Sequence, residues 1–176
     1  MARSLKATIK ASLIGTLTND STTAKDDIVL SATQSLTNGT GANQAQRFWY
    51  DTGRTLSASA NDSIDVYDLG SLDIGAGAGL DSLGQSHALT GIKALYVKNH
   101  SDSGGNIRVG GDGTAAAWNS PFNGDDDALV DLPPGGVLLL VAPDASGWAV
   151  ADTSNHLLKI TDAGSGSTYD IGFVGI

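Results

Sequence analysis

Apolar and polar residues alternate along most of the chain with the two-residue period of β-strands. The opening segment LKATIKASL, residues 5–13, alternates aliphatic residues with lysine, threonine and serine. Residues two apart lie on the same face of a strand, so this pattern predicts a strand with one apolar face, from about residue 5 to residue 18. The sequence lacks a convincing helical spacing of i, i+3, i+4 and i+7. By the same criteria further strands are predicted at 27–36, 45–51, 54–60, 63–69, 89–99, 106–109, 128–132, 137–142, 148–151, 157–161 and 168–174.

Glycine, asparagine and aspartate separate these segments, as in Asn19-Asp20-Ser21. Many short strands joined by such turns are typical of a sandwich or a barrel. We therefore expect an all-β protein: one antiparallel β-sandwich of jelly-roll type over residues 1–176, with residues 1–4 as a candidate short N-terminal arm. The number of strands does not by itself distinguish a jelly roll from an immunoglobulin-like sandwich. Residues 72–84 and 110–127 are predicted to be long loops.

The segment VLLLVA, residues 137–142, has apolar residues on both faces of its predicted strand. An antiparallel sheet usually turns one face to water, so the second face of this strand needs a cover. We assign the second face to Leu138, Leu140 and Ala142 and treat it as a candidate interface. Either another chain or the loop 110–127 of the same chain would cover it.

Composition narrows the classes of function. The net charge is -9, and only 16% of the residues are charged. Binding to nucleic acid or to an anionic membrane surface needs clustered lysine and arginine, so neither partner is expected. All 19 acidic residues are aspartate, which favours turns over helices. The chain has no cysteine, charged residues interrupt any signal-peptide core at its start, and no apolar run approaches the roughly 18 residues of a membrane span.

Candidate catalytic and metal-binding residues are few. The three histidines, His87, His100 and His156, are not accompanied by a G-x-S-x-G motif, and we interpret them as solvated or capping residues. The run Asp125–Asp127 lacks the calcium-loop spacing, and a turn-forming acidic run is favoured over a calcium site. Gly75–Gly79 lacks the spacing of a dinucleotide-binding loop. We therefore expect no enzyme activity, no cofactor and no metal.

The aromatic residues suggest one binding function. Phe48, Trp49 and Tyr50, together with Trp118 and Phe122, are candidates for a platform that stacks on sugar rings. Consecutive residues of a strand alternate between its faces, so at least one of the first three is expected in the core. The alternative function is therefore a jelly-roll module on a tail or other surface. It would recognise host glycan through the aromatic and aspartate-rich loop 110–127.

Several segments resemble small structural proteins of tailed-bacteriophage virions. The resemblance is carried by LPPGGVLLLVAPDASGWAV (132–150) followed by HLLKITDAGSGSTYDIGFVG (156–175), and by GIKALYVKNHSDSGGNIRVGGDG (91–113). It is looser over NGTGANQA (38–45) and RFWYDTGRTLSASANDSIDVYDL (47–69). It rests on a pattern of strands and turns without a catalytic signature.

The resemblance implies a head decoration or cement protein that stabilises the capsid by bridging major capsid subunits. Its expected partners are the major capsid protein and further copies of itself, as a homotrimer or a dimer. Its expected location is the outer capsid surface, after assembly in the cytoplasm of a host bacterium. Arg3, Lys6 and Lys10 would then form a basic arm on an acidic capsid surface, or they are solvent-facing charges that protect an edge strand.

Overall fold

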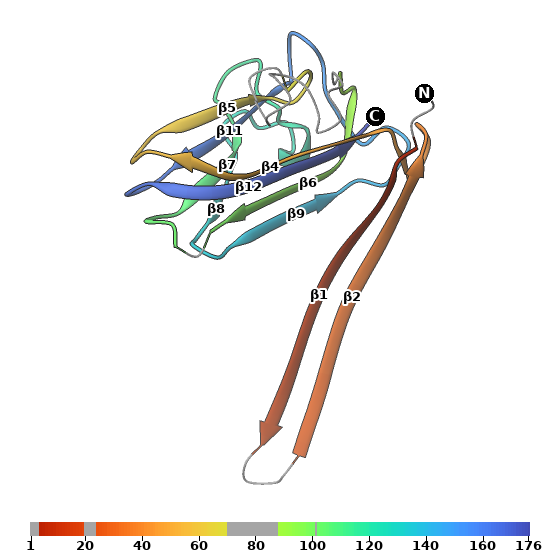
Figure 1. Cartoon of the computed structure of the whole chain (residues 1–176), viewed down its shortest axis with the longest axis vertical. Coiled ribbons are helices and arrows are strands. Elements are labelled where there is room, and N and C mark those ends of the chain that lie inside the picture. Colours follow the sequence, from red (N-terminus) through yellow and green to blue (C-terminus); the bar gives the residue numbers. More distant parts are fainter. Residues whose placement is uncertain (1–3, 20–23, 70–87, 101) are drawn as a thin grey trace.

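The computed structural model describes residues 4–19, 24–69, 88–100 and 102–176 and consists of a sandwich body and a projecting β-ribbon (Figure 1). Within the described residues, the helical structure is limited to one 3₁₀ turn, η1 (Ser120–Phe122), and no helix is long and apolar enough to cross a membrane. The strands are β1 (Lys6–Asn19), β2 (Ala24–Asn38), β3 (Gln44–Ala45), β4 (Arg47–Leu56), β5 (Asn61–Asp65), β6 (Gly91–Asn99), β7 (Ile107–Gly111), β8 (Leu129–Leu132), β9 (Val137–Val141), β10 (Trp148–Ala149), β11 (Leu157–Asp162) and β12 (Ser167–Gly175).

Two antiparallel sheets form the body. The first has the strand order β10-β6-β12-β4, and β9 pairs with β6 next to β10. The second has the order β5-β11-β7-β8. The chain passes from one sheet to the other at most connections, whereas β7 and β8 are neighbours in the same sheet. The predicted all-β antiparallel sandwich is therefore confirmed.

The main core lies between these two sheets and contains the inward-facing alternate residues of both. Trp49 of β4 is 1% exposed and packs against Phe173 of β12, with 5.9 Å between the ring centroids. Trp118, from the connection between β7 and β8, is fully buried and donates its indole N–H to the Ala149 carbonyl at 3.0 Å. A buried ring therefore anchors this connection to the sandwich.

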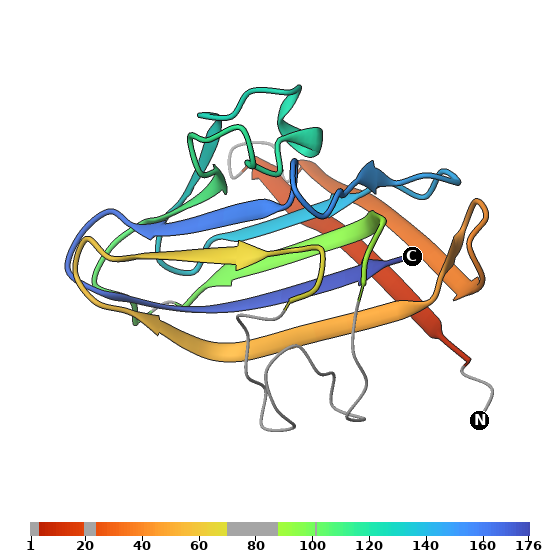
Figure 2. The same ribbon diagram turned by 90° about the horizontal axis from the view of Figure 1, so that it is seen from above.

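The ribbon β1–β2, here called the arm, projects from the body (Figure 1). Its strands pair over their whole length, from Lys6 opposite Thr37 to Asn19 opposite Ala24. The 14 residues of β1, at about 3.3 Å each, give an arm of roughly 45 Å. Seen from above, the arm crosses the direction of the body strands obliquely (Figure 2). The predicted opening strand exists, but it belongs to this arm rather than to the sandwich.

Other predicted strand bounds differ from the structure. The strand expected at 63–69 is found as β5 at Asn61–Asp65. The segments 45–51 and 54–60 were expected as separate strands, but β4 continues from Arg47 to Leu56. Gly53 has φ +70° within it, and the pairing of β12 with β4 shifts register nearby. The glycine and the register shift therefore produce a local irregularity at the position where a turn was expected, and the strand continues through it. The predicted loop 72–84 lies outside the described residues.

Candidate functional site

The arm has two chemically different faces. Residues paired across an antiparallel ribbon share a face, so Leu13, for example, lies with Leu30. The opposite face is mostly polar, with lysine, threonine and serine, although it includes the apolar pair Ile14 and Val29. The first face, which we call the apolar arm face, carries Leu5, Ala7, Ile9, Ala11, Leu13 and Leu17 from the β1 side and Ile28, Leu30, Ala32, Gln34 and Leu36 from β2.

The end of the apolar arm face near the body is docked. Leu36 and Ala45 are fully buried and form a small second core with Ala94 of β6 and Val174 of β12. The aliphatic residues at the start of β1 pack around this cluster. The backbone reinforces the junction, because the Gln46 N–H donates to a carbonyl at the end of β12 at 2.8 Å. The arm is thus fixed to the side of the first sheet that faces away from the main core.

The far end of the same face is uncovered as far as Asp26, which lies opposite Leu17 near the tip. Four of its residues form what we call the distal strip: Leu13, Leu17, Ile28 and Leu30, which are 67%, 69%, 45% and 60% exposed. Fully burying an aliphatic side chain of this size contributes about 1.5–3 kcal/mol. Because the four side chains are largely exposed, the single chain lacks several kcal/mol of stabilisation that their burial would give. Contiguous apolar surface of this kind marks an interaction site.

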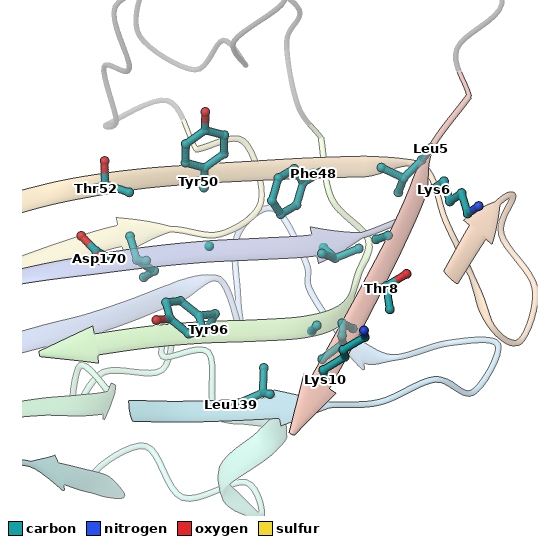
Figure 3. A pocket seen from close by; sticks show the side chains of 16 residues that line it. Leu5, Lys6, Thr8, Lys10, Phe48, Tyr50, Thr52, Tyr96, Leu139 and Asp170 are labelled. Atoms are coloured by element: carbon teal, nitrogen blue, oxygen red, sulfur yellow. The ribbon is translucent and has the colours of Figure 1, made fainter. Parts of the chain in front are cut away.

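The first sheet also has an exposed apolar surface on its outward side, here called the outer sheet face. Phe48 and Tyr50 of β4 are 48% and 47% exposed and stack with 5.6 Å between ring centroids. Tyr96 of β6 is 38% exposed and lies opposite Leu139 of β9. These side chains lie beside β1 where it crosses the sheet (Figure 3). Together with the near end of the arm they line a groove of about 550 Å³.

A glycine deepens this groove. The pairing of β4, β12 and β6 places Gly172 between Tyr50 and Tyr96 in one row across the sheet. Because Gly172 has no side chain, the floor between the two tyrosine positions stays low. A Cβ atom at this position would have its nearest neighbours at 3.6 Å, so the space is open rather than blocked by backbone.

A carboxylate lies at the end of the groove that is far from the arm. Asp170 lines it and accepts hydrogen bonds from the Gly53 N–H at 2.9 Å and from Nε2 of His100 at 2.7 Å. Burial raises the pKa of Asp170, but the bonds from His100 and from the Gly53 N–H outweigh this effect and hold the pKa below its usual value. The groove therefore has an apolar and aromatic floor, with Lys6 and Lys10 of the arm on one side and the carboxylate of Asp170 at the far end.

The structure corrects the assignment of sides on β9. Leu138 and Leu140, predicted to form an interface, pack against the main core of the same chain, and Ala142 is only 8% exposed. The outward residues are the opposite alternate set, of which Leu139 and Val141 line a recess together with residues of the arm. The neighbour of this second apolar face is therefore the arm. The loop expected as the alternative cover packs its tryptophan into the main core instead.

Two of the three basic residues predicted to form an N-terminal contact with the capsid lie on β1. Lys6 and Lys10 lie on the polar face of β1 and are exposed. Within the described residues β1 pairs with β2 alone, so both lysines also sit on an edge strand. Arg3 lies outside the described residues.

The histidines and the acidic run have structural partners. His156 Nδ1 lies 2.9 Å from Asp65 Oδ2, and His100 binds the carboxylate at the end of the groove, while His87 lies outside the described residues. In the acidic run at 125–127, the first carboxylate accepts the backbone N–H of the third residue at 2.9 Å, which is the predicted turn. Among the described residues no group of three or more metal-ligating side chains occurs. The distinctive chemistry of this surface therefore lies in its apolar and aromatic side chains.

The aromatic residues divide between the faces as expected for consecutive positions. Trp49 is in the main core, while Phe48 and Tyr50 are on the outer sheet face. Trp118 is also fully buried and Phe122 packs against the same core, so these two rings do not form a platform on the loop.

Sequence reasoning missed Tyr96 and the distal strip as parts of a surface. Tyr96 lies in a strand that is otherwise mostly buried, and its alternation alone does not show that one side is open. The available signal for the strip was the pair of consecutive apolar runs, Leu13-Ile14 and Ile28-Val29-Leu30, which place apolar residues on both faces of a ribbon.

No protein-family model matches the chain, and no curated protein matches it significantly.

Proposed function

We propose that this protein is a structural virion component that decorates a bacteriophage capsid and stabilises it by bridging major capsid subunits. The observation that carries the proposal is the arm. A docked ribbon of roughly 45 Å reaches well beyond the body, and its far half has exposed side chains on both faces. Such a segment is suited to contact a neighbour in an assembly, where many identical weak contacts add together. The proposed role is structural and not catalytic.

We also infer that the body is a jelly roll. In support, eight strands form two four-stranded sheets, counting β9 and β10 as one interrupted edge, and the chain alternates between the sheets at most connections. Immunoglobulin-like sandwiches instead divide seven or nine strands between their sheets.

In this proposal the polar face of the arm contacts the capsid. It carries Lys6 and Lys10 at the end near the body, and serine and threonine hydroxyls further along. A chain with a net charge of -9 approaches an acidic shell most easily through its basic residues. Lys6→Asp and Lys10→Asp should each weaken binding to the capsid. The matched control is Lys159→Asp on β11 of the second sheet, which makes the same charge change away from the arm.

The first experiment is quantitative mass spectrometry of purified virions, with the major capsid protein as the internal reference. A ratio near one to one, or one to three, would support decoration of the capsid lattice. A few copies per particle would contradict it and favour a place in the tail or portal. Absence from the virion would overturn the proposal. Binding of the purified protein to capsids that lack it then allows the lysine variants to be compared.

A second candidate function is glycan recognition, and one observation favours it. The stacked pair Phe48 and Tyr50 lies exposed on the outer sheet face, beside a groove that ends at Asp170. Aromatic faces with a nearby carboxylate suit a sugar ring and its hydroxyl groups. Calorimetry with host polysaccharide tests this candidate. Saturable binding that Phe48→Ala abolishes would support it, and no heat at millimolar sugar would reject it.

A further inference from the structure

We propose that the distal strip of the arm is covered by the outer sheet face of a second copy of this chain, in a reciprocal exchange of arms between two copies. The inference goes beyond the proposed function, because it concerns the isolated protein and needs no capsid. It rests on two uncovered apolar surfaces that belong to one chain and that match in chemistry.

The chain already contains one example of the proposed contact. Near the body, the apolar arm face packs onto the outer sheet face at Ala94 and Val174, which are 4% and 6% exposed. The distal strip continues this same face of the arm with the same aliphatic chemistry. The outer sheet face likewise continues beyond the docked area into Phe48, Tyr50 and Tyr96. Each surface therefore extends past the contact that the single chain makes.

The direction of the arm brings the strip to a neighbour. Within the described residues β9 is an outer strand of its sheet, and Ile9 and Ala11 of the arm line a recess with its Leu139 and Val141. Beyond these residues the arm extends away from the body on the side of β9 (Figure 1). A second body placed on the far side of β9 would receive the arm on its own outer sheet face. A twofold axis between the two bodies makes the exchange reciprocal.

Charge favours a second copy as the occupant. The arm segments ASLIGTL (11–17) and IVLSATQSL (28–36) contain no charged residue. The aromatic side chains of the groove beside the arm, Phe48, Tyr50 and Tyr96, are uncharged as well, whereas Lys6 and Lys10 line its arm side and Asp170 its far end. Two chains that each carry a net charge of -9 repel one another, so a contact between them is confined to such uncharged surfaces. The strip and the aromatic part of the outer sheet face meet this condition.

The area argues for two reciprocal contacts. Seven residues of ribbon, about 23 Å long and roughly 10 Å wide, give a footprint of about 230 Å². One contact removes this area from solvent on both partners, so two contacts remove about 900 Å². This is a flat footprint, and the uneven surface of the side chains makes the accessible area larger. A stable interface buries about 1,200 Å² or more. A single one-way contact falls far below this threshold, whereas the reciprocal pair approaches it, which favours a dimer over the trimer that the resemblance also allowed.

The test is the mass of the full chain in solution, by sedimentation velocity between about 1 and 100 µM. Exchange predicts a dimer that the double variant Leu13→Asp/Leu30→Asp weakens at least about 100-fold, since it disrupts two contacts by tenfold or more each. The matched control is Ser12→Asp/Ser31→Asp, which adds the same charge at the neighbouring paired positions on the polar face. Circular dichroism checks that both variants are folded.

Two further measurements separate exchange from other modes of association. Tyr50→Ser/Tyr96→Ser should weaken the dimer as the strip variant does, and a mixture of the two variants should form a weak heterodimer through the one intact contact. Because the chain has no cysteine, Leu30→Cys in one copy and Tyr96→Cys in another should be joined by a short bismaleimide. A wild-type monomer at the highest concentration, a dimer unaffected by the strip variant, or equal loss in the serine control would overturn the proposal. None of these results would affect capsid binding by the monomer, which tests the proposed function separately.

Discussion

The docking of the arm can be tested by one substitution at two positions of the same strand. Leu36 and Leu30 both lie on the apolar arm face of β2, but Leu36 is fully buried at the junction and Leu30 is 60% exposed. Replacing a fully buried leucine by alanine costs about 2–5 kcal/mol, since it removes transfer free energy and leaves a cavity. An exposed leucine leaves no such cavity. We expect Leu36→Ala to lower the free energy of unfolding by about 3 kcal/mol and Leu30→Ala by less than about 0.5 kcal/mol.

Urea unfolding at about 1 µM and below, followed by tryptophan fluorescence and far-ultraviolet circular dichroism, measures both variants where association contributes least. For a chain of this size, a loss of about 3 kcal/mol corresponds to a fall in Tm of about 6–12 °C. Limited proteolysis provides a second readout, because Leu36→Ala should make the junction between β2 and β3 more susceptible to cleavage. Equal destabilisation by the two variants would show that the far half of the arm packs on its own body. An unaffected Leu36→Ala variant would refute the docked junction itself.

Three further predictions concern the body. Tyr169→Phe should cost about 2 kcal/mol in urea unfolding, because the buried hydroxyl donates to the Asp62 carboxylate at 2.7 Å. Burial raises the pKa of Asp162, but hydrogen bonds from a serine hydroxyl and three backbone N–H groups outweigh it and lower the pKa. The stabilisation from this lowered pKa is therefore present above about pH 4 and is lost as the pH falls further. Asp162→Asn should make the free energy of unfolding depend less on pH in this acid range, which urea unfolding from neutral to acid pH measures. Gly110→Ala would place a Cβ atom 2.0 Å from a backbone carbonyl oxygen and should lower the free energy of unfolding by about 3 kcal/mol or more. Gly53→Ala has open space around it and meets only the strain of its positive φ, so it should cost about 1 kcal/mol. Thermal unfolding compares the two variants.

The alternation of residues predicts most strands of this protein because most of them have one face in a core. The strand expected at 89–99, for example, is found as β6 at Gly91–Asn99. Alternation identifies an apolar face, but it does not say what covers that face. The apolar side of β1 has the same pattern whether a second sheet, a partner or water lies beyond it. Its place in a projecting arm therefore followed only from the pairing of β1 with β2 over their whole length.

The sides of β9 show a second limit of the sequence. Both alternate sets of residues 137–142 are aliphatic, so no difference in polarity marks the set that faces the core. The choice is made by the partner strand, because Leu138 lies opposite Val97 and Leu140 lies opposite Leu95, two fully buried residues of β6. A shift of one residue in this pairing would exchange the sides. The register is a property of the folded sheet, and the sequence of one strand does not contain it.

The distribution of charge along the arm indicates that its middle part binds one specific partner surface. A two-stranded ribbon is marginally stable alone in water, and only the near end of this one is held by its own body. Charged residues occur at both ends of the arm, as Lys6 and Lys10 near the body and Asp26 and Asp27 near the tip. Such charges discourage indiscriminate pairing of exposed strand edges. The uncharged middle, which carries the distal strip, lacks that protection, so this segment is the part of the arm where burial by a matching surface would add most to stability.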